Sequence, residues 1–272
     1  MGVDRVRYHW LNFHVPYACR NSGACCSSGW PIPIERERAA AVLQFKPNSE
    51  LWLVPLSGAP EDVAGTLAIG DNDHCVFHVG QSCAIHSAKP SACRHFPYVC
   101  LIDQRGVHVT LSHYCPTAAS LLFEHDGPIE IVEGPPPIAG LEIPEGLDAR
   151  ESLPPLASAT RLMSFQEFSD WETAQIAMLS KRVARDWPVF GNVVARYLAA
   201  KLFASWAAYQ GDGTDAVLKL VDVAESRLKA EVARQCAAAG RALDADLLKE
   251  AIRQSDLFLV HRADSRLLSA PE

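Results

Sequence analysis

From residue 160 onward, apolar side chains recur at the intervals typical of amphipathic helices. This region opens with Ser164-Phe165-Gln166-Glu167, a capping box in which the serine hydroxyl and the glutamate carboxylate satisfy free backbone amides. Apolar positions then follow at helical spacing: Trp171, Ala174, Ile176, Leu179 and Val183. The pattern predicts a helix that begins at the capping box.

Two breaks divide the rest of this region into further helices. The breaks are Asp186-Trp187-Pro188, where the proline cannot continue a helix, and the turn Gly211-Asp212-Gly213. Polar capping residues follow the second break and recur near residue 244. The pattern therefore predicts three more helices, ending near residues 209, 239 and 254.

The first 125 residues or so lack this long periodicity and are rich in loops. Short runs in which β-branched and apolar residues alternate or cluster predict strands over residues 66–69, 75–78, 99–102 and 107–111. A short helix is expected over residues 35–45, and Pro90 and Pro116 each suit the first turn of a helix.

Prolines separate these two regions. Seven of the eighteen prolines fall between residues 127 and 155, which favours an extended connector. We therefore expect an α+β protein with three parts. An irregular, cysteine-rich N-terminal half with short strands (1–133) leads through a proline-rich connector (134–159) into a helical C-terminal half (160–272).

Charge and hydropathy exclude several classes of partner. The net charge of −7 argues against a dedicated nucleic-acid binder, which normally presents a basic face. The N-terminal segment mixes charged and aromatic residues and lacks the apolar core of a secretory signal. No stretch approaches the roughly 18 apolar residues of a membrane span. We expect a cytoplasmic protein without a nucleic-acid or membrane partner.

The cysteines are concentrated in one part of the chain. Of the nine, only Cys236 lies outside the segment from residue 19 to residue 115. Stable disulfides are rare in a reducing compartment, so a local concentration of thiols indicates metal ligation or redox chemistry. The alternative is a secreted disulfide scaffold, which requires an export signal that the sequence does not show.

The cysteine spacing leaves the metal open. None of the spacings forms a repeated Cys-x-x-Cys knuckle, which disfavours a zinc finger or zinc ribbon. Thiolates that are far apart in the sequence suit an iron–sulfur cluster and a multi-thiolate zinc site equally well. The adjacent Cys25 and Cys26, with Gly23 and Gly29 beside them, are expected to present two thiolates to one shallow pocket.

The order of these motifs resembles the CxxCxxCC family of zinc- or iron-chelating proteins, also called the YkgJ type. The likeness rests on four ordered segments: Gly23-Ala24-Cys25-Cys26 after Cys19, Cys75-Val76-Phe77, Cys83 through Cys93-Arg94-His95-Phe96-Pro97, and Cys115-Pro116. Ser22 stands where the family has its second cysteine, and Lys89 replaces the usual arginine before Pro90.

Two details are similar to one branch of that family, the FliB-type flagellin lysine-N-methylases. They are Cys25-Cys26-Ser27-Ser28-Gly29-Trp30 and the stretch from Ser112 to Leu122 around Cys115-Pro116. This resemblance implies an iron–sulfur cluster of the [4Fe–4S] type, S-adenosylmethionine as a cofactor, and a protein substrate with exposed lysines. The sequence lacks the glycine-rich turn of Rossmann-type methyltransferases, so the cofactor would need a non-standard site.

The ligand candidates come from this family pattern. They are Cys25, Cys26, Cys83, Cys93 and Cys115, with Cys19 and Cys75 behind them. Cys100 and Cys236 fall outside the pattern, and we expect them to pack in apolar surroundings. Catalytic residues are not assigned.

Histidines near the cysteines leave a further ligand type open. Five of them lie within four residues of a cysteine, so a Cys3His site is chemically reasonable, and His95 and His113 are the two to test. Ordinary hydrogen bonding is the alternative role for each.

Three functions therefore stand beside one another: a protein lysine N-methyltransferase, a non-enzymatic zinc- or iron-binding module, and a thiol redox sensor that uses Cys25 and Cys26.

Overall fold

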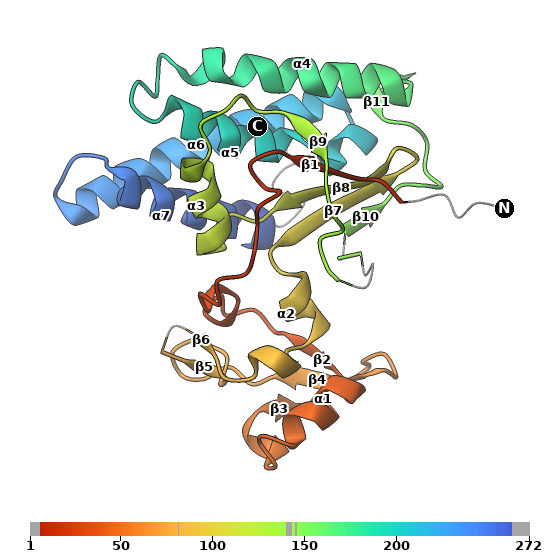
Figure 1. The fold of residues 1–272 in the computed structure, drawn as a ribbon, viewed down its shortest axis with the longest axis vertical. Coiled ribbons are helices and arrows are strands. Elements are labelled where there is room, and N and C mark those ends of the chain that lie inside the picture. The colour runs from red at the N-terminus through yellow and green to blue at the C-terminus, as the bar shows by residue number, and fades with distance from the viewer. Residues whose placement is uncertain (1–5, 81, 140–142, 145, 263–272) are drawn as a thin grey trace. The chain divides into compact units, whose positions relative to one another are not determined.

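The computed structural model describes residues 6–80, 82–139, 143–144 and 146–262, and the chain divides into two compact units (Figure 1). Unit 1 comprises Met1–Tyr17 and Pro97–Glu272, and unit 2 comprises Ala18–Phe96. Unit 2 is therefore an insertion into unit 1. This division differs from the expected boundaries at residues 133 and 160, because residues 97–133 supply strands to the sheet of unit 1.

Unit 1 contains a five-stranded sheet in the order β10-β7-β8-β1-β9. The strands are β1 (Tyr8–Leu11), β7 (Tyr98–Asp103), β8 (Gly106–Leu111), β9 (Ile131–Glu133) and β10 (Gly146–Asp148). β7 and β8 form an antiparallel hairpin, whereas β1 runs parallel to β8 and β10 runs parallel to β7. The sheet thus joins the N-terminal strand β1 to strands that lie about ninety or more residues later in the sequence.

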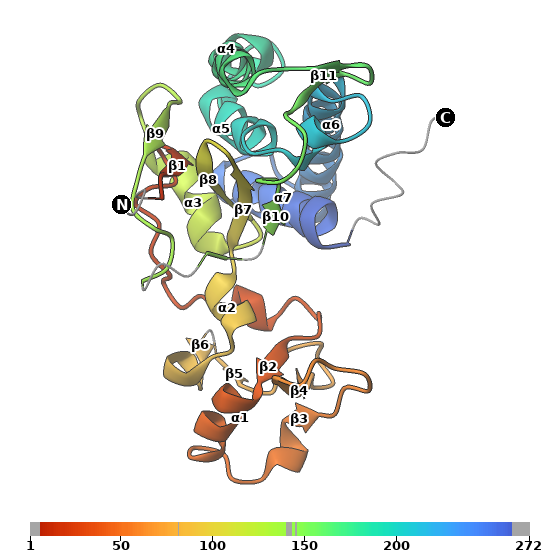
Figure 2. The ribbon, with the colours of Figure 1, turned by 90° about the vertical axis from the view of Figure 1, so that its right-hand side faces the viewer.

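The helices of unit 1 pack on this sheet through one shared hydrophobic core (Figures 1 and 2). Leu11 of β1, Leu101 of β7 and Tyr197 belong to that core and are fully buried. The helices are α3 (Pro116–Glu124), α4 (Phe165–Val183), α5 (Gly191–Leu202), α6 (Thr214–Ala239) and α7 (Ala245–Asp256), the last continuing into a π-helical turn (Leu257–Arg262). Within the described ranges, no helix has the length and apolar character that crossing a membrane requires.

Most predictions for unit 1 are confirmed, and three are corrected. The N-cap of α6 is Gly213 and not one of the polar residues after it, and no side chain caps this helix. The Ser164–Glu167 capping box forms as expected, and Asp244 caps α7. The second helix ends at Leu202 and not near residue 209, because Ala204 adopts a left-handed backbone (φ 56°) and a short 3-10 helix, η4 (Trp206–Tyr209), follows. The connector is not simply extended. It supplies β10, and also β11 (Leu156–Ser158), which pairs with β12 (Arg161–Leu162).

Unit 2 has a small core of its own, which includes Ile34, Val42, Trp52 and Phe77. An antiparallel sheet of β2 (Pro33–Glu35), β4 (Val63–Leu67) and β3 (Leu53–Val54) packs with helix α1 (Arg36–Leu43). The hairpin β5 (His78–Val79) and β6 (Ser82–Cys83), helix α2 (Ser91–His95), and the 3-10 turns η1 (Ala24–Cys26), η2 (Ser49–Leu51) and η3 (His86–Ala88) complete it.

The predicted strand at residues 75–78 is wrong. Cys75 makes a single bridge to Ile69, and the strand β5 begins only at His78. The overall prediction of an α+β protein, with short strands mostly in the N-terminal half and helices in the C-terminal half, is confirmed.

Candidate metal centre

The first two thiols of the site lie on the turn η1. The backbone reaches this turn through Asn21 and Gly23, both with positive φ (54° and 72°), and leaves it through Gly29 (φ 73°). The amide of Cys26 donates to the carbonyl of Gly23 at 2.8 Å, which closes the turn. Cys26 is buried and Cys25 is half-buried. The glycines beside the vicinal cysteines thus supply the left-handed backbone that brings both thiols to one place.

Two more thiols come from the region of the β5–β6 hairpin. The amide of Cys75 donates to the carbonyl of Cys26 at 2.7 Å, which ties the start of this region to η1. Cys83 ends β6, opposite His78 in the hairpin, and its amide donates to the side chain of Asn21 at 3.4 Å. Backbone hydrogen bonds therefore hold the two cysteine-bearing segments side by side.

The thiol of Cys26 is the common partner in this group. It hydrogen-bonds with the thiols of Cys25, Cys75 and Cys83. These bonds, followed by burial and the negative charge of Cys25, raise the pKa of Cys26 far above its usual value. The bond to Cys26 is also the main cause that lowers the pKa of each neighbour, to about 6 for Cys83. We call these four residues the thiol group.

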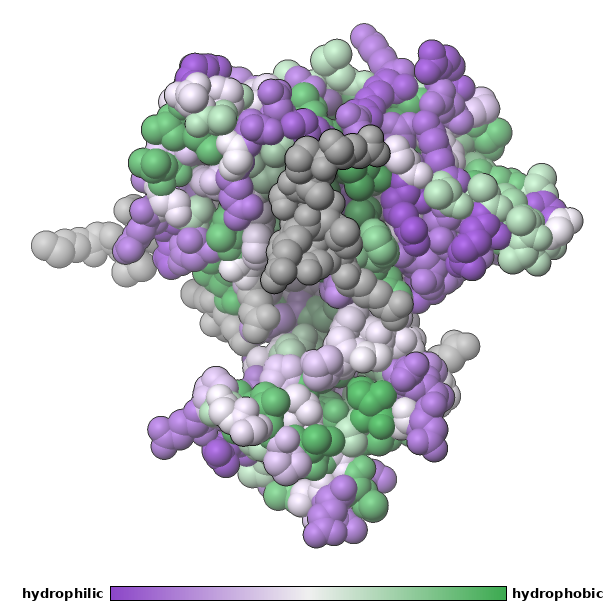
Figure 3. Space-filling view, turned by 180° about the vertical axis from the view of Figure 1, so that it is seen from behind, coloured by the Kyte–Doolittle hydropathy of each residue, from purple (hydrophilic) through white to green (hydrophobic). Residues whose placement is uncertain are grey.

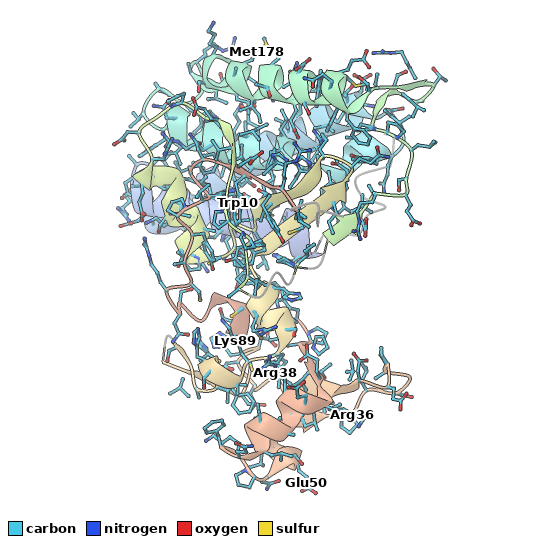
Figure 4. The ribbon with its side chains drawn as sticks, turned by 45° about the vertical axis from the view of Figure 1, so that its right-hand side comes forward. Trp10, Arg36, Arg38, Glu50, Lys89 and Met178 are labelled. Carbon is cyan, nitrogen blue, oxygen red and sulfur yellow. The ribbon has the colours of Figure 1, made fainter. Side chains whose placement is uncertain are left out.

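Cys93 and Lys89 flank the thiol group. Cys93 lies on α2 and is buried, and its pKa is raised first by burial and then by the negative charge of Cys25, Cys75 and Cys83. Lys89 lies in the segment between η3 and α2 (Figure 4), and its ammonium helps to lower the pKa of Cys25 and Cys83 after the bond from Cys26. A fifth thiol and one cation therefore lie within electrostatic range.

The chemistry of the donors fits zinc or iron, although the thiols are not yet placed as ligands. Thiolate sulfur is the ligand that both metals take from cysteine-rich sites. Among the residues that the structure describes, however, no three or more His, Cys, Asp or Glu side chains are arranged to hold a metal ion. Metal binding therefore requires Cys26 to lose its proton and its side chain to move from its place as the common hydrogen-bond partner.

The structure does not bring all seven predicted ligands into the thiol group. Cys19 is exposed, and its sulfur accepts a hydrogen bond from the amide of Asn21 at 3.4 Å. Cys115 belongs to unit 1, where it is buried at the start of α3, and its sulfur lies 3.7 Å from the hydroxyl of Tyr17.

The remaining two cysteines lie outside the thiol group. Cys100 on β7 is fully buried, and burial raises its pKa to about 12. Cys236 lies half-buried near the end of α6. All nine cysteines have free thiols.

Sequence reasoning missed one pair of histidines. The ring nitrogens Nδ1 of His74 and Nδ1 of His78 lie 2.9 Å apart. Their i, i+4 spacing was the only signal in the sequence, and it carries little weight outside a helix. Of the two histidines singled out, His95 lies half-buried on α2, whereas His113 is fully buried in unit 1.

Unit 2 leaves much apolar surface exposed for its size. Phe45, Leu51 and Val79 are each more than half exposed, and apolar side chains reach the face of unit 2 seen in Figure 3. Its strands have two to five residues. Small domains with little core commonly depend on a metal or on disulfides for stability.

The comparisons with known proteins agree with this chemistry. Residues 18–116 match a family model named CxxCxxCC, described as a "Putative zinc- or iron-chelating domain". The match covers all of unit 2 and extends through β7 and β8 to the start of α3. No curated protein and no solved structure matches the chain. The predicted resemblance to the wider family is confirmed over residues 18–116, and the methylase branch stays a prediction.

Proposed function

We propose that the thiol group of unit 2 binds one metal ion as a tetrathiolate site, because residues 18–116 match the model of a zinc- or iron-chelating domain. Cys25, Cys26, Cys75 and Cys83 would each supply one thiolate. The ion would be structural. It would link the turn η1 to the β5–β6 hairpin and stabilise the folded form of unit 2 directly.

The convergence of three thiols on Cys26 is the observation that carries this proposal. Ligands of a tetrahedral site with Zn–S bonds of about 2.3 Å are separated by about 3.8 Å from one another. That separation is close to the distance of a thiol hydrogen bond, so Cys26 stands at about ligand spacing from each of its three partners. A group this compact suits a single ion better than a cluster, whose cysteine ligands stand farther apart.

Lys89 supports the same proposal through charge. Four thiolates around a divalent cation carry a net charge of −2, which is costly in partly buried surroundings. A cation within electrostatic range of Cys25 and Cys83 offsets part of that cost. Lys89 stands where the family usually has arginine, so the positive charge is retained.

An iron–sulfur cluster is the second candidate. Cys93 is buried, and the charge of three members of the thiol group raises its pKa. It would supply a fifth thiol for a larger centre. The resemblance to the methylase branch supports the same cofactor. Methylation of a protein lysine from S-adenosylmethionine rests on that resemblance alone, and so does a protein partner with exposed lysines. Neither is part of the proposal.

Spectroscopy of the whole chain separates a single ion from an iron–sulfur cluster. Protein purified without oxygen should be colourless and should, after exchange with Co²⁺, show the intense thiolate-to-cobalt absorption of a tetrahedral sulfur site. Brown protein with broad visible absorption would contradict the single-ion site and favour the cluster. Colourless protein whose cobalt spectrum lacks thiolate bands would contradict both.

A further inference from the structure

The His74–His78 pair lies outside the thiol group, although it is on the same stretch of chain. Their rings meet edge to face, with centroids 4.7 Å apart and an interplanar angle of 63°. Both side chains are half-buried, so solvent reaches the pair. The two Nδ1 atoms, at 2.9 Å, share one hydrogen bond, which means that one imidazole donates and the other accepts.

Backbone hydrogen bonds hold both histidines in place. The carbonyl of His74 accepts from the amide of Gly70 at 2.7 Å, and the amide of His74 donates to the side chain of Asn72 at 3.1 Å. The amide of His78 donates to the carbonyl of Cys75 at 2.8 Å, and β5 then pairs with β6. The close approach of the two rings is therefore built into the turn.

This arrangement suits a divalent cation. Two imidazoles bound to a tetrahedral ion at about 2.0–2.1 Å place their nitrogens roughly 3.3 Å apart, a little farther than the 2.9 Å observed. A cation can thus replace the shared proton with a small opening of the pair. Asp71 and Asp73, which are exposed on the same loop, add negative charge.

We propose that His74 and His78 form a second metal site, separate from the thiol group, that takes a zinc-type divalent cation through two imidazole nitrogens. No third His, Cys, Asp or Glu among the described residues joins them, so water completes the coordination. Imidazole with water is a ligand set for zinc and other late first-row metals, and it binds more weakly than four thiolates. The second site is therefore exchangeable when the thiol group holds its ion.

A zinc titration of the full chain, followed by NMR of the histidine rings, tests this site. Protein that already carries one equivalent of Zn²⁺ receives a second equivalent, and the ring signals of His74 and His78 should shift. Loss of an outer-sphere partner alone commonly costs about tenfold in metal affinity. His74→Gln and His78→Gln, which each remove a ligand, should therefore weaken the second binding by at least about tenfold.

The control is His125→Gln, a change in unit 1 that should leave the second binding unaltered. Because His78 pairs with Cys83, the cobalt thiolate bands of each variant show whether the thiol group is intact, and His74→Gln serves if His78→Gln disturbs it. Absence of a second equivalent in the wild type, or its persistence in both variants, would overturn the proposal. Failure of the tetrathiolate site would appear separately, as missing thiolate bands.

Discussion

At the scale of single residues, the thiol group depends on the proton that Cys26 retains. The bond to this one side chain is the main cause that lowers the pKa of each of its three neighbours. The lowered pKa of these three ligands brings each of them closer to the thiolate form that binds metal. Cys26, whose pKa is raised, must lose its proton for the metal to bind.

The hydrogen bond between Cys26 and Cys83 predicts how the reactivity of Cys83 depends on pH. Its pKa of about 6 places half of the side chain in the thiolate form near pH 6, so its alkylation rate in metal-free protein should rise with pH and level off above about pH 7. Cys26→Ala removes the main cause of the shift, and the midpoint should move up toward the usual value of about 8.5. Mass spectrometry of the Cys83 peptide after brief treatment with iodoacetamide measures both midpoints.

Cys236→Ala, far along the sequence on α6, should leave the midpoint of Cys83 unchanged. The same midpoint in wild type and Cys26→Ala would show that Cys26 is not the donor to Cys83.

The sequence could predict the thiols but not which of them converge. Because Cys25 and Cys26 are adjacent, the sequence alone predicted that both thiols face one pocket. The approach of Cys75 and Cys83 depends on hydrogen bonds between Cys75 and Cys26 and between Cys83 and Asn21, which span about fifty or more residues. Cys115 matches the family pattern as well as any other candidate, yet it belongs to unit 1.

At the scale of elements, the sequence predicted the features that neighbouring residues determine, but it did not predict the pairing of strands that are distant in the sequence. The capping box at Ser164 and the cap at Asp244 are set by residues three positions apart, so the sequence shows them directly. The pairing of β10 with β7 joins residue 147 to residue 101, and no local pattern encodes it. The sequence therefore did not predict the two strands β10 and β11 that lie in the proline-rich connector.

Helix α4 carries a buried carboxyl group whose protonation affects the stability of unit 1. Glu172 is almost completely buried, accepts a hydrogen bond from the amide of Ala204 at 3.1 Å, and lies 3.7 Å from the guanidinium of Arg105. Burial outweighs the attraction of Arg105 and raises its pKa to about 7. The folded protein therefore binds this proton more tightly than the unfolded chain does.

The free energy of unfolding should consequently fall as the pH rises from about 4.5 to about 7, by up to roughly 3 kcal/mol from this group. Its stabilising contribution is complete below the unfolded pKa and is lost as the pH passes the folded pKa. Glu172→Gln should remove that part of the slope and stabilise the protein at pH 8. Urea unfolding at several pH values measures the effect, and an unchanged slope in the variant would contradict it.

At the scale of the whole molecule, two separate hydrophobic cores correspond to the two units. The core of unit 1 unites the sheet with the C-terminal helices, whereas the core of unit 2 is small and includes the buried cysteines Cys26, Cys75 and Cys93. Composition alone places divisions near residues 133 and 160, because it does not show that unit 2 is inserted in unit 1. The stability of unit 2, but not that of unit 1, should accordingly depend on the metal.

Chelation is expected to unfold unit 2 and to spare unit 1. A strong chelator should increase amide hydrogen exchange across residues 18–96, because the ion that links η1 to the hairpin is removed. The helices α4 to α7 should keep their protection, since their core contains no member of the thiol group. Equal loss of protection in both units would contradict a stabilising role confined to unit 2.

The central claim is tested most directly by the metal content of the purified chain and of two cysteine variants. Elemental analysis should find one zinc or iron ion per chain in the wild type and in Cys236→Ser. The ion should be lost from Cys75→Ser, which removes a buried member of the thiol group. A metal-free wild type, or metal retained by Cys75→Ser and lost from Cys236→Ser, would contradict the account.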